Sequence, residues 1–236
     1  NTMKEEGLSA TSVRIYLTLI RVILNYARKM NYVNYPVHPF VLFKMPVSNV
    51  RELDLTIDEM KRIRDVKLCK PTLKMVRDLF MLTYYLAGMN LVDMLAYDFR
   101  TDIVDYIRIK TRNTKDGDRL TSFAIPDEAK PLIKKYMNKN TGKLVFGKYK
   151  TYVSCYNTLT RKMKVLKTVA GVTHNLTLYS ARKSFVQHGY DLGIPLSTLE
   201  YCIGQSMKED RPIFNYVSIM KKHADKAIRE ILDNLK

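Results

Sequence analysis

An arginine and a tyrosine near the end of the chain have the side chains that phosphate chemistry requires. Arg182 follows Tyr179 in the stretch "LTLYSARKSFVQHGYDLGIP" (176–195), and Tyr216 stands 34 residues after the arginine in "RPIFNYVSIM". A guanidinium can hold phosphate oxygens through paired hydrogen bonds, and a phenol oxygen can act as a nucleophile. The chain has 16 tyrosines, however, so Tyr216 taken alone is more simply a packing residue. The surrounding elements must decide between these two interpretations.

The charge balance favours a polyanionic partner. The 236 residues include 40 Lys and Arg against 23 Asp and Glu, which gives a net charge of +17 and an isoelectric point near 9.7. Such an excess attracts polyanions, and nucleic acid is the commonest, although ribosomal and membrane-surface proteins share the property. The length allows one large domain or two modest ones, and 46% hydrophobic residues is ordinary for a soluble globular protein.

The cysteines and the apolar runs exclude several other classes of protein. Cys69, Cys155 and Cys202 are far apart and form no CxxC pair, so we expect neither a disulfide framework nor a zinc site. This usage fits a reducing cytoplasm. No apolar run approaches the length that crosses a bilayer, and the first residues lack a signal-peptide pattern. The chain starts at Asn1 rather than at a methionine, which suggests a piece of a longer protein.

Residues 9–32 predict a helix with an apolar face and a basic stripe. Apolar side chains between Val13 and Ala27 recur at helical spacing. The basic stripe could lie along a row of phosphates or form the solvated edge of a packed helix, and the sequence does not separate these alternatives. The prolines of "YPVHPFVLFKMP" (35–46) then predict an extended linker. The stripe consists of arginines seven residues apart: Arg14, Arg21 and Arg28.

A second unit follows, in which the predicted elements are mostly helices. Thr56 with Glu59 three residues later is a capping box that begins one helix, and a second helix over 72–87 ends at Gly88. Two β-rich runs around a polar turn with Asp-Gly predict a hairpin over 103–125. The rest of the chain returns to helical spacing. The predicted fold class is therefore mainly α with a small antiparallel β-sheet.

In this order the elements resemble the tyrosine recombinase (phage integrase) family, over nearly the whole chain. The run "RKSFVQH" (182–188) is similar to the family's R-H-x-F-A-x-H, and "LGIP" with "LEYCIGQS" is similar to its G-x-x-x…x-L-G-H-S stretch. Tyr216 stands where the family keeps its nucleophile. The resemblance implies a partial helical (SAM-like) core-binding domain with a linker over 1–50, and a catalytic integrase domain over 51–236.

The resemblance implies an enzyme of site-specific DNA recombination, typical of phages and mobile elements, that forms a 3′-phosphotyrosine and uses no cofactor or metal. Tyr216 would attack the phosphate, and Arg182 would stabilise the charge that develops on its oxygens. Lys115 in the hairpin turn would protonate the leaving 5′ oxygen, with Lys110 and Arg119 as alternatives. The remaining histidine of the run, His188, should pack behind the site.

Three positions depart from the family pattern. Asn90 replaces the arginine of G-[LM]-R-x-x-[ED], and asparagine brings neither a charge nor a fork of donors. Tyr179 and Gln205 replace histidines, and each can still donate a hydrogen bond to a phosphate oxygen. Another arginine, such as Arg77 or Arg100, could compensate for Asn90. The sequence thus predicts either an active recombinase with an altered site or a DNA-binding relative with impaired catalysis.

A basic RNA-binding or scaffold protein is a third interpretation, but it leaves the spacing of the arginine and the tyrosine unexplained. The expected partner is double-stranded DNA, gripped in a C shape by the two domains in a bacterial cytoplasm. The resemblance implies a homo-oligomer, a tetramer on DNA, and a monomer in solution. No membrane partner is expected. The expected DNA-binding residues are Arg14, Arg21, Arg28, Arg112 and Lys183.

Overall fold

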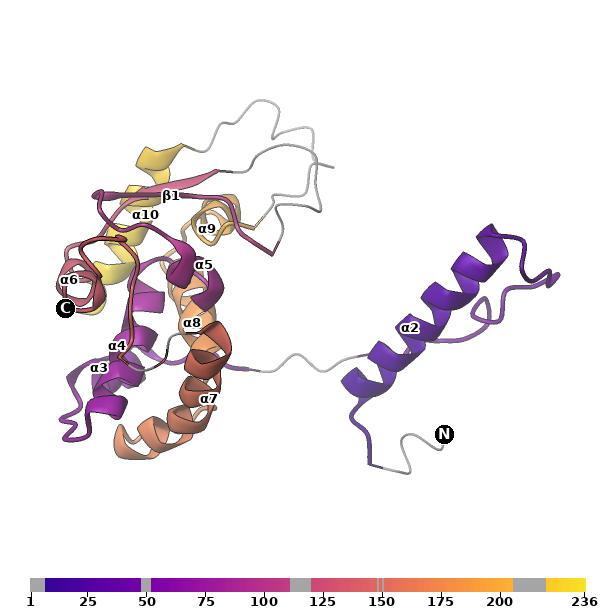
Figure 1. The fold of residues 1–236 in the computed structure, drawn as a ribbon, viewed down its shortest axis with the longest axis horizontal. Coiled ribbons are helices and arrows are strands. Elements are labelled where there is room, and N and C mark those ends of the chain that lie inside the picture. Colours follow the sequence, from indigo (N-terminus) through magenta and orange to yellow (C-terminus); the bar gives the residue numbers. More distant parts are fainter. Residues whose placement is uncertain (1–6, 48–51, 111–119, 148, 150, 206–219) are drawn as a thin grey trace. The chain divides into compact units, whose positions relative to one another are not determined.

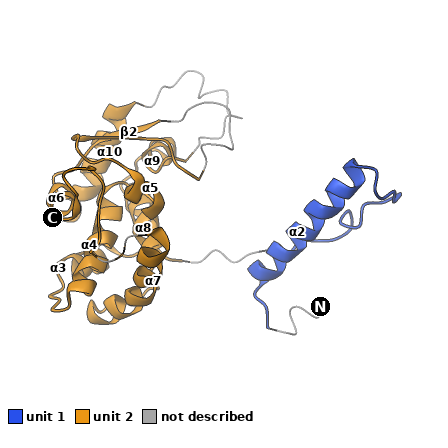
Figure 2. Cartoon of the chain, in the orientation of Figure 1, with its two compact units in different colours: residues 1–51 blue, residues 52–236 orange. Residues whose placement is uncertain are grey.

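The computed structural model describes residues 7–47, 52–110, 120–147, 149, 151–205 and 220–236. The chain divides into two compact units, Asn1–Arg51 and Glu52–Lys236 (Figure 2). The described elements are helices and one two-stranded antiparallel sheet, which confirms the predicted fold class. Within the described residues, no helix is both long and apolar enough to cross a membrane.

The first unit contains one long helix and a segment that folds back along it. Helix α2 (Ala10–Lys29) confirms the helix predicted there. Residues 35–46 form no helix, as their prolines predicted, and the segment makes hydrogen bonds to its own helix. The Tyr35 hydroxyl donates to the Leu24 carbonyl at 3.0 Å, and Arg14 donates to the Pro46 carbonyl at 3.3 Å. The prolines prevent a helix, but the aromatic side chains between them gain more by packing than by remaining in water.

Helix α2 carries more apolar surface than this segment covers. Val13 is buried, whereas Leu19 and Ile23 remain 57% and 65% exposed. Apolar side chains on more than one face are typical of a helix buried on several sides. Helix α2 is therefore consistent with part of a core-binding domain, which remains a prediction.

The second unit begins with two helices whose ends follow the sequence signals. Thr56 caps α3 (Ile57–Asp65), and the predicted capping box with Glu59 is confirmed. Helix α4 (Pro71–Tyr85) starts at a proline, which lacks the N–H that a first turn leaves unbonded. The helix ends just before Gly88, where φ is +72°, as the sequence predicted.

Helix α8 packs against helices from both earlier and later parts of this unit (Figure 1). Helix α4 packs against α3, α6, α7 and α8, while α8 also contacts α9 and α10. The side chains of α4 are buried over most of its circumference, so this helix is the centre of the core. The remaining helices are α5 (Leu91–Ala96), α6 (Lys130–Tyr136), α7 (Tyr152–Val169), α8 (Leu178–Asp191), α9 (Leu196–Cys202) and α10 (Lys221–Asp233).

The predicted hairpin is present and packs on the last two helices. Strand β1 (Ile103–Tyr106) pairs antiparallel with β2 (Thr121–Ala124), and Val104 lies opposite Phe123 with both side chains fully buried. Strand β2 contacts α9 and α10. Residues 111–119, the turn of the hairpin, lie outside the described residues.

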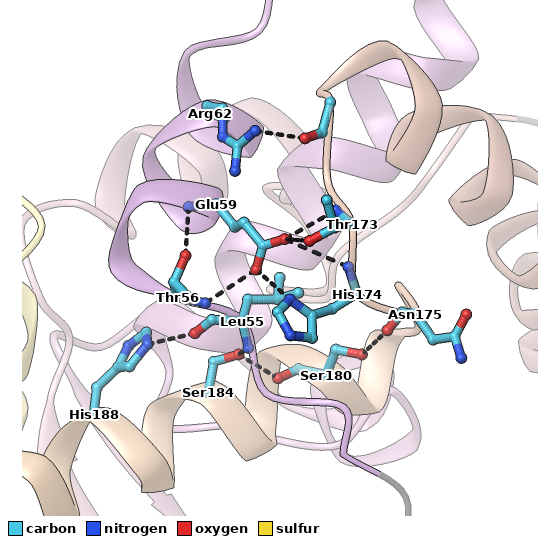
Figure 3. Close-up of polar contacts among 11 residues, drawn as sticks. Leu55, Thr56, Glu59, Arg62, Thr173, His174, Asn175, Ser180, Ser184 and His188 are labelled. Carbon is cyan, nitrogen blue, oxygen red and sulfur yellow. Dashed lines mark hydrogen bonds and ion pairs between the residues drawn. The ribbon is translucent and has the colours of Figure 1, made fainter.

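The start of the second unit is tied to α8 (Figure 3). The Leu55 amide donates to Ser184 Oγ at 2.8 Å, and His188 Nε2 lies 2.7 Å from the Leu55 carbonyl oxygen. The other ring nitrogen of His188 lies 2.7 Å from the Tyr84 hydroxyl. Burial lowers the pKa of His188, so the neutral ring donates to Leu55 and accepts from Tyr84. His188 thus packs in the core, as expected.

Glu59 is a buried carboxylate that joins α3 to the segment before α8 (Figure 3). It is 1% exposed, and it accepts hydrogen bonds from the Thr56 amide, from the amide and hydroxyl of Thr173, and from His174. Burial alone would raise its pKa, but these hydrogen bonds outweigh burial and lower the pKa from 4.5 to about 2. The carboxylate therefore stabilises the fold in its charged form.

We expect Glu59→Gln to lower the free energy of unfolding by about 2–3 kcal/mol at pH 7, because the charged acceptor is lost. This stabilisation is complete above pH 4.5 in the wild type and is lost as the pH falls toward 2. The gap between wild type and variant should therefore shrink over this range in urea denaturation. Glu52→Gln, at an exposed carboxylate, is the control and should match the wild type. A gap that stays constant down to pH 2 would contradict the assignment.

Candidate functional site

A cleft of about 580 Å³ lies at the N-terminal end of α8. Four segments that are distant in the sequence contribute to it: the connection between α4 and α5, the residues after β1, the start of α7 and the residue after Gly204. The cleft brings together most of the described residues that the sequence marked for the site. These are Asn90, Lys110, Tyr179, Arg182 and Gln205.

Arg182 is the buried cation of the cleft. It is 4% exposed, and its guanidinium donates to the carbonyls of Gly88 at 2.8 Å and Ile203 at 2.6 Å. Both acceptors are neutral, so these bonds orient the charge without neutralising it. Burial, followed by the nearby charge of Arg108, lowers the pKa of Arg182 to about 10. The group is still protonated at neutral pH and can bind an anion.

Asn90 lies in the cleft but is neutral. Its amide donates to the carboxylate of Asp93 at 3.3 Å. Asp93 is buried, and its other oxygen accepts from the Ile109 amide at 2.8 Å. The residue at the family's first arginine position therefore binds a neighbouring acid and brings no cation to the cleft.

Arg108 also lines the cleft, although no motif in the sequence pointed to it. A signal was available, because Val104, Tyr106 and Arg108 alternate along "IVDYIRIK". The first two face the core from β1, so an extended chain would carry the third to the same side. The alternation is hard to recognise in the sequence, because a strand that faces the core usually alternates apolar residues, whereas the third residue here is charged.

The two arginines expected to compensate for Asn90 are not in the cleft. Arg77 forms an ion pair with the buried carboxylate of Asp78 at 2.9 Å, and Arg100 forms one with Asp98. Neither lines the cleft. The structure therefore does not place either possible replacement in the cleft, and each arginine is paired with an acid one or two residues away in the sequence.

The other predicted residues are placed as follows. Tyr179 is 52% exposed at the mouth of the cleft, whereas Lys183 is half-buried on α8 and does not line it. Arg14, Arg21 and Arg28 are exposed on α2, and the guanidinium carbon of Arg28 lies 6.0 Å from the centre of the Tyr35 ring. Outside the described residues lie Arg112, Lys115, Arg119 and Tyr216.

The described fold resembles a solved structure named as an integrase from mycobacterium phage Brujita, with a TM-score of 0.54 and 14% identity. The match covers 100% of this chain and 77% of that one. At this identity the likeness shows the fold alone. No protein-family model matches the sequence, and neither does any curated protein.

The described part of the chain contains no group of three or more His, Cys, Asp or Glu that could hold a metal ion. The polar lining of the cleft instead consists of cations and hydrogen-bond donors, including Arg108, Lys110, Tyr179, Arg182 and Gln205. Such a lining suits a phosphate group, whose oxygens are strong acceptors.

Proposed function

We propose that the chain is a tyrosine recombinase, which cuts and rejoins DNA through a 3′-phosphotyrosine intermediate. The observation that carries this proposal is the buried, protonated guanidinium of Arg182 in a cleft that Lys110, Tyr179 and Gln205 also line. A phosphodiester that enters the cleft would meet donors on several sides. The integrase-like fold supports the same activity.

In this reaction the hydroxyl of Tyr216 loses its proton to water as its oxygen attacks the scissile phosphorus, and the bond from phosphorus to the 5′ oxygen breaks. Arg182 stabilises the negative charge on the non-bridging oxygens, with Tyr179 and Gln205 as further donors. A lysine gives its proton to the departing 5′ oxygen. Lys110 lines the cleft, and Lys115 is the alternative from the hairpin turn. Rejoining reverses these steps with a new 5′ hydroxyl, so the phosphotyrosine conserves the energy of the bond.

A suicide substrate tests the activity. Nicked DNA duplexes with random sequence around the nick are incubated with the protein, so that cleavage next to the nick releases a short 5′-hydroxyl fragment that diffuses away. We expect a protein–DNA band that survives denaturing electrophoresis and disappears after protease treatment. Sequencing the attached strand would define the target site. Absence of the band with a pool that the protein binds would refute the enzymatic proposal.

The second candidate is a DNA-binding relative with impaired catalysis, and Asn90 is the observation that favours it. Asparagine offers no charge at this position, and its amide is already bonded to Asp93. This candidate predicts retention of duplex DNA without any covalent band. In both cases the proposed partner is double-stranded DNA, with four copies assembled on it.

We expect affinity for duplex DNA to fall about 10³-fold or more between 50 and 200 mM salt, since several phosphates would exchange counterions for protein cations. Replacing the α2 arginines by glutamine should reduce the slope of log K against log[salt] by about 3, at roughly 0.9 for each phosphate contact. Fluorescence anisotropy at five salt concentrations measures this. The test set is Arg14, Arg21 and Arg28.

The control set removes the same charge from cations that have carboxylate partners: Arg64, Lys130 and Arg229. Its slope should stay close to that of the wild type. Equal slopes for the two sets would show that α2 does not contact the phosphates, and a flat dependence in the wild type would exclude DNA as the partner.

A further inference from the structure

We propose that Arg108 is the second phosphate-binding guanidinium of the cleft and supplies, from the segment after β1, the charge that Asn90 lacks. This inference rests on the proposed function, in which the ligand is a DNA phosphodiester.

Two polar groups near Arg182 lack partners. Among the described residues, three buried side-chain polar atoms have no hydrogen-bond partner: Nε2 of His38 in the first unit, Oη of Tyr106 and Nε of Arg108. Tyr106 and Arg108 both lie near Arg182. The charge of Arg182 acts to lower the pKa of Tyr106, against the larger effect of burial, and the charge of Arg108 lowers the pKa of Arg182. A buried donor without a partner destabilises the fold unless a ligand binds it. Unbonded groups beside two like charges indicate a site for an anion.

The two arginines are positioned in the same way. The stem of Arg182 lies across Gly88, where an added Cβ would be 2.6 Å from its Cγ, and the guanidinium donates to the Gly88 carbonyl. The stem of Arg108 lies across Gly204, where an added Cβ would be 2.8 Å from its Cδ, and the guanidinium lies 3.3 Å from the Gly204 carbonyl. Both glycines have positive φ, +72° and +62°. Each arginine stem thus packs against a glycine with positive φ, where a larger residue would be strained and would collide with the stem.

The neighbours of Asn90 hold the segment that carries Arg108. Asp93 accepts from Asn90 with one oxygen and from the Ile109 amide with the other. The backbone next to Arg108 is therefore anchored to the start of α5. An arginine from this segment lines the same cleft as Asn90, and a guanidinium that donates two bonds to a phosphate can come from either position.

The first experiment compares adduct formation on the suicide substrate. We expect Arg108→Gln to slow adduct formation about 100-fold, as for the loss of one oxyanion donor, while DNA affinity changes less than about threefold. Adding Asn90→Arg to this variant should restore at least tenfold, because it returns a guanidinium to the same cleft. Arg100→Gln removes an exposed, ion-paired arginine outside the cleft and should match the wild type. An Arg108→Gln rate within twofold of wild type, or no restoration by Asn90→Arg, would overturn the proposal.

The second experiment does not require activity. Millimolar inorganic phosphate, compared with chloride at equal ionic strength, should raise the melting temperature of the wild type and of Arg100→Gln. The increase should be lost in Arg108→Gln and return in the double variant. An equal increase in wild type and Arg108→Gln would overturn the proposal even if the wild type forms no adduct. Loss of the increase without adduct formation would support the anion site and refute the proposed enzyme.

Arg108→Lys covers the case in which Arg108→Gln does not fold. Lysine keeps the charge and the aliphatic stem along Gly204 but removes the planar fork. We expect adduct formation between that of wild type and Arg108→Gln, with most of the phosphate-dependent stabilisation kept. A lysine variant that folds but has lost all of this stabilisation would contradict a role based on charge.

Discussion

Tyr216→Phe is expected to abolish the covalent protein–DNA band, a loss of more than about 10³-fold, while DNA affinity stays within about twofold. The substitution removes only the nucleophilic oxygen and keeps the ring, so every contact made by the rest of the side chain is retained. The measurement is the suicide-substrate gel, with anisotropy for binding.

Two other tyrosines provide matched controls for this variant. Tyr190→Phe, on an exposed side chain of α8 outside the cleft, should leave the adduct unchanged. Tyr179→Phe should slow it about tenfold, because a single neutral donor at the phosphate is lost. Adduct formation by Tyr216→Phe at the wild-type level would exclude this residue as the nucleophile. The tyrosines that line the cleft would then be the candidates: Tyr152, Tyr156 and Tyr179.

Arg182→Lys is expected to reduce adduct formation about 10²- to 10³-fold, with a much smaller effect on DNA affinity. Lysine keeps the positive charge but lacks the planar guanidinium. It therefore cannot donate to the carbonyls of Gly88 and Ile203 and to a phosphate at the same time in this fixed geometry. The rate of adduct formation at saturating DNA measures the effect.

The matched control for Arg182→Lys is Arg62→Lys. The Arg62 guanidinium also donates to a backbone carbonyl, that of Gly171 at 2.5 Å, but it lies outside the cleft. It should lose little activity. A wild-type rate for Arg182→Lys would mean that only the charge of Arg182 matters, and an equal loss in both variants would indicate a general effect on stability.

The sequence alone determined the features that depend on near neighbours in the chain. Thr56 and Glu59 predicted a helix start because both halves of a capping box lie within one turn. Gly88 predicted a helix end because it tolerates positive φ, and the hairpin followed from a turn between two β-rich runs. The motif around Arg182 lies on α8, and residues of α8 line the cleft.

The tertiary structure decided which distant residues share the cleft. Gly88 and Arg182 are 94 positions apart, and Arg108 and Gly204 are 96 apart, yet each pair is in direct contact. The alternation with Val104 and Tyr106 indicates that Arg108 lies on the core side of its segment, but it does not show that Arg108 lies near Arg182. Arg108 differs from Arg77 and Arg100 in its three-dimensional partner: the other two arginines have neighbouring carboxylates, whereas Arg108 reaches Arg182. Burial and the distance between charges are set by packing between elements, so residue types and spacing could not predict them.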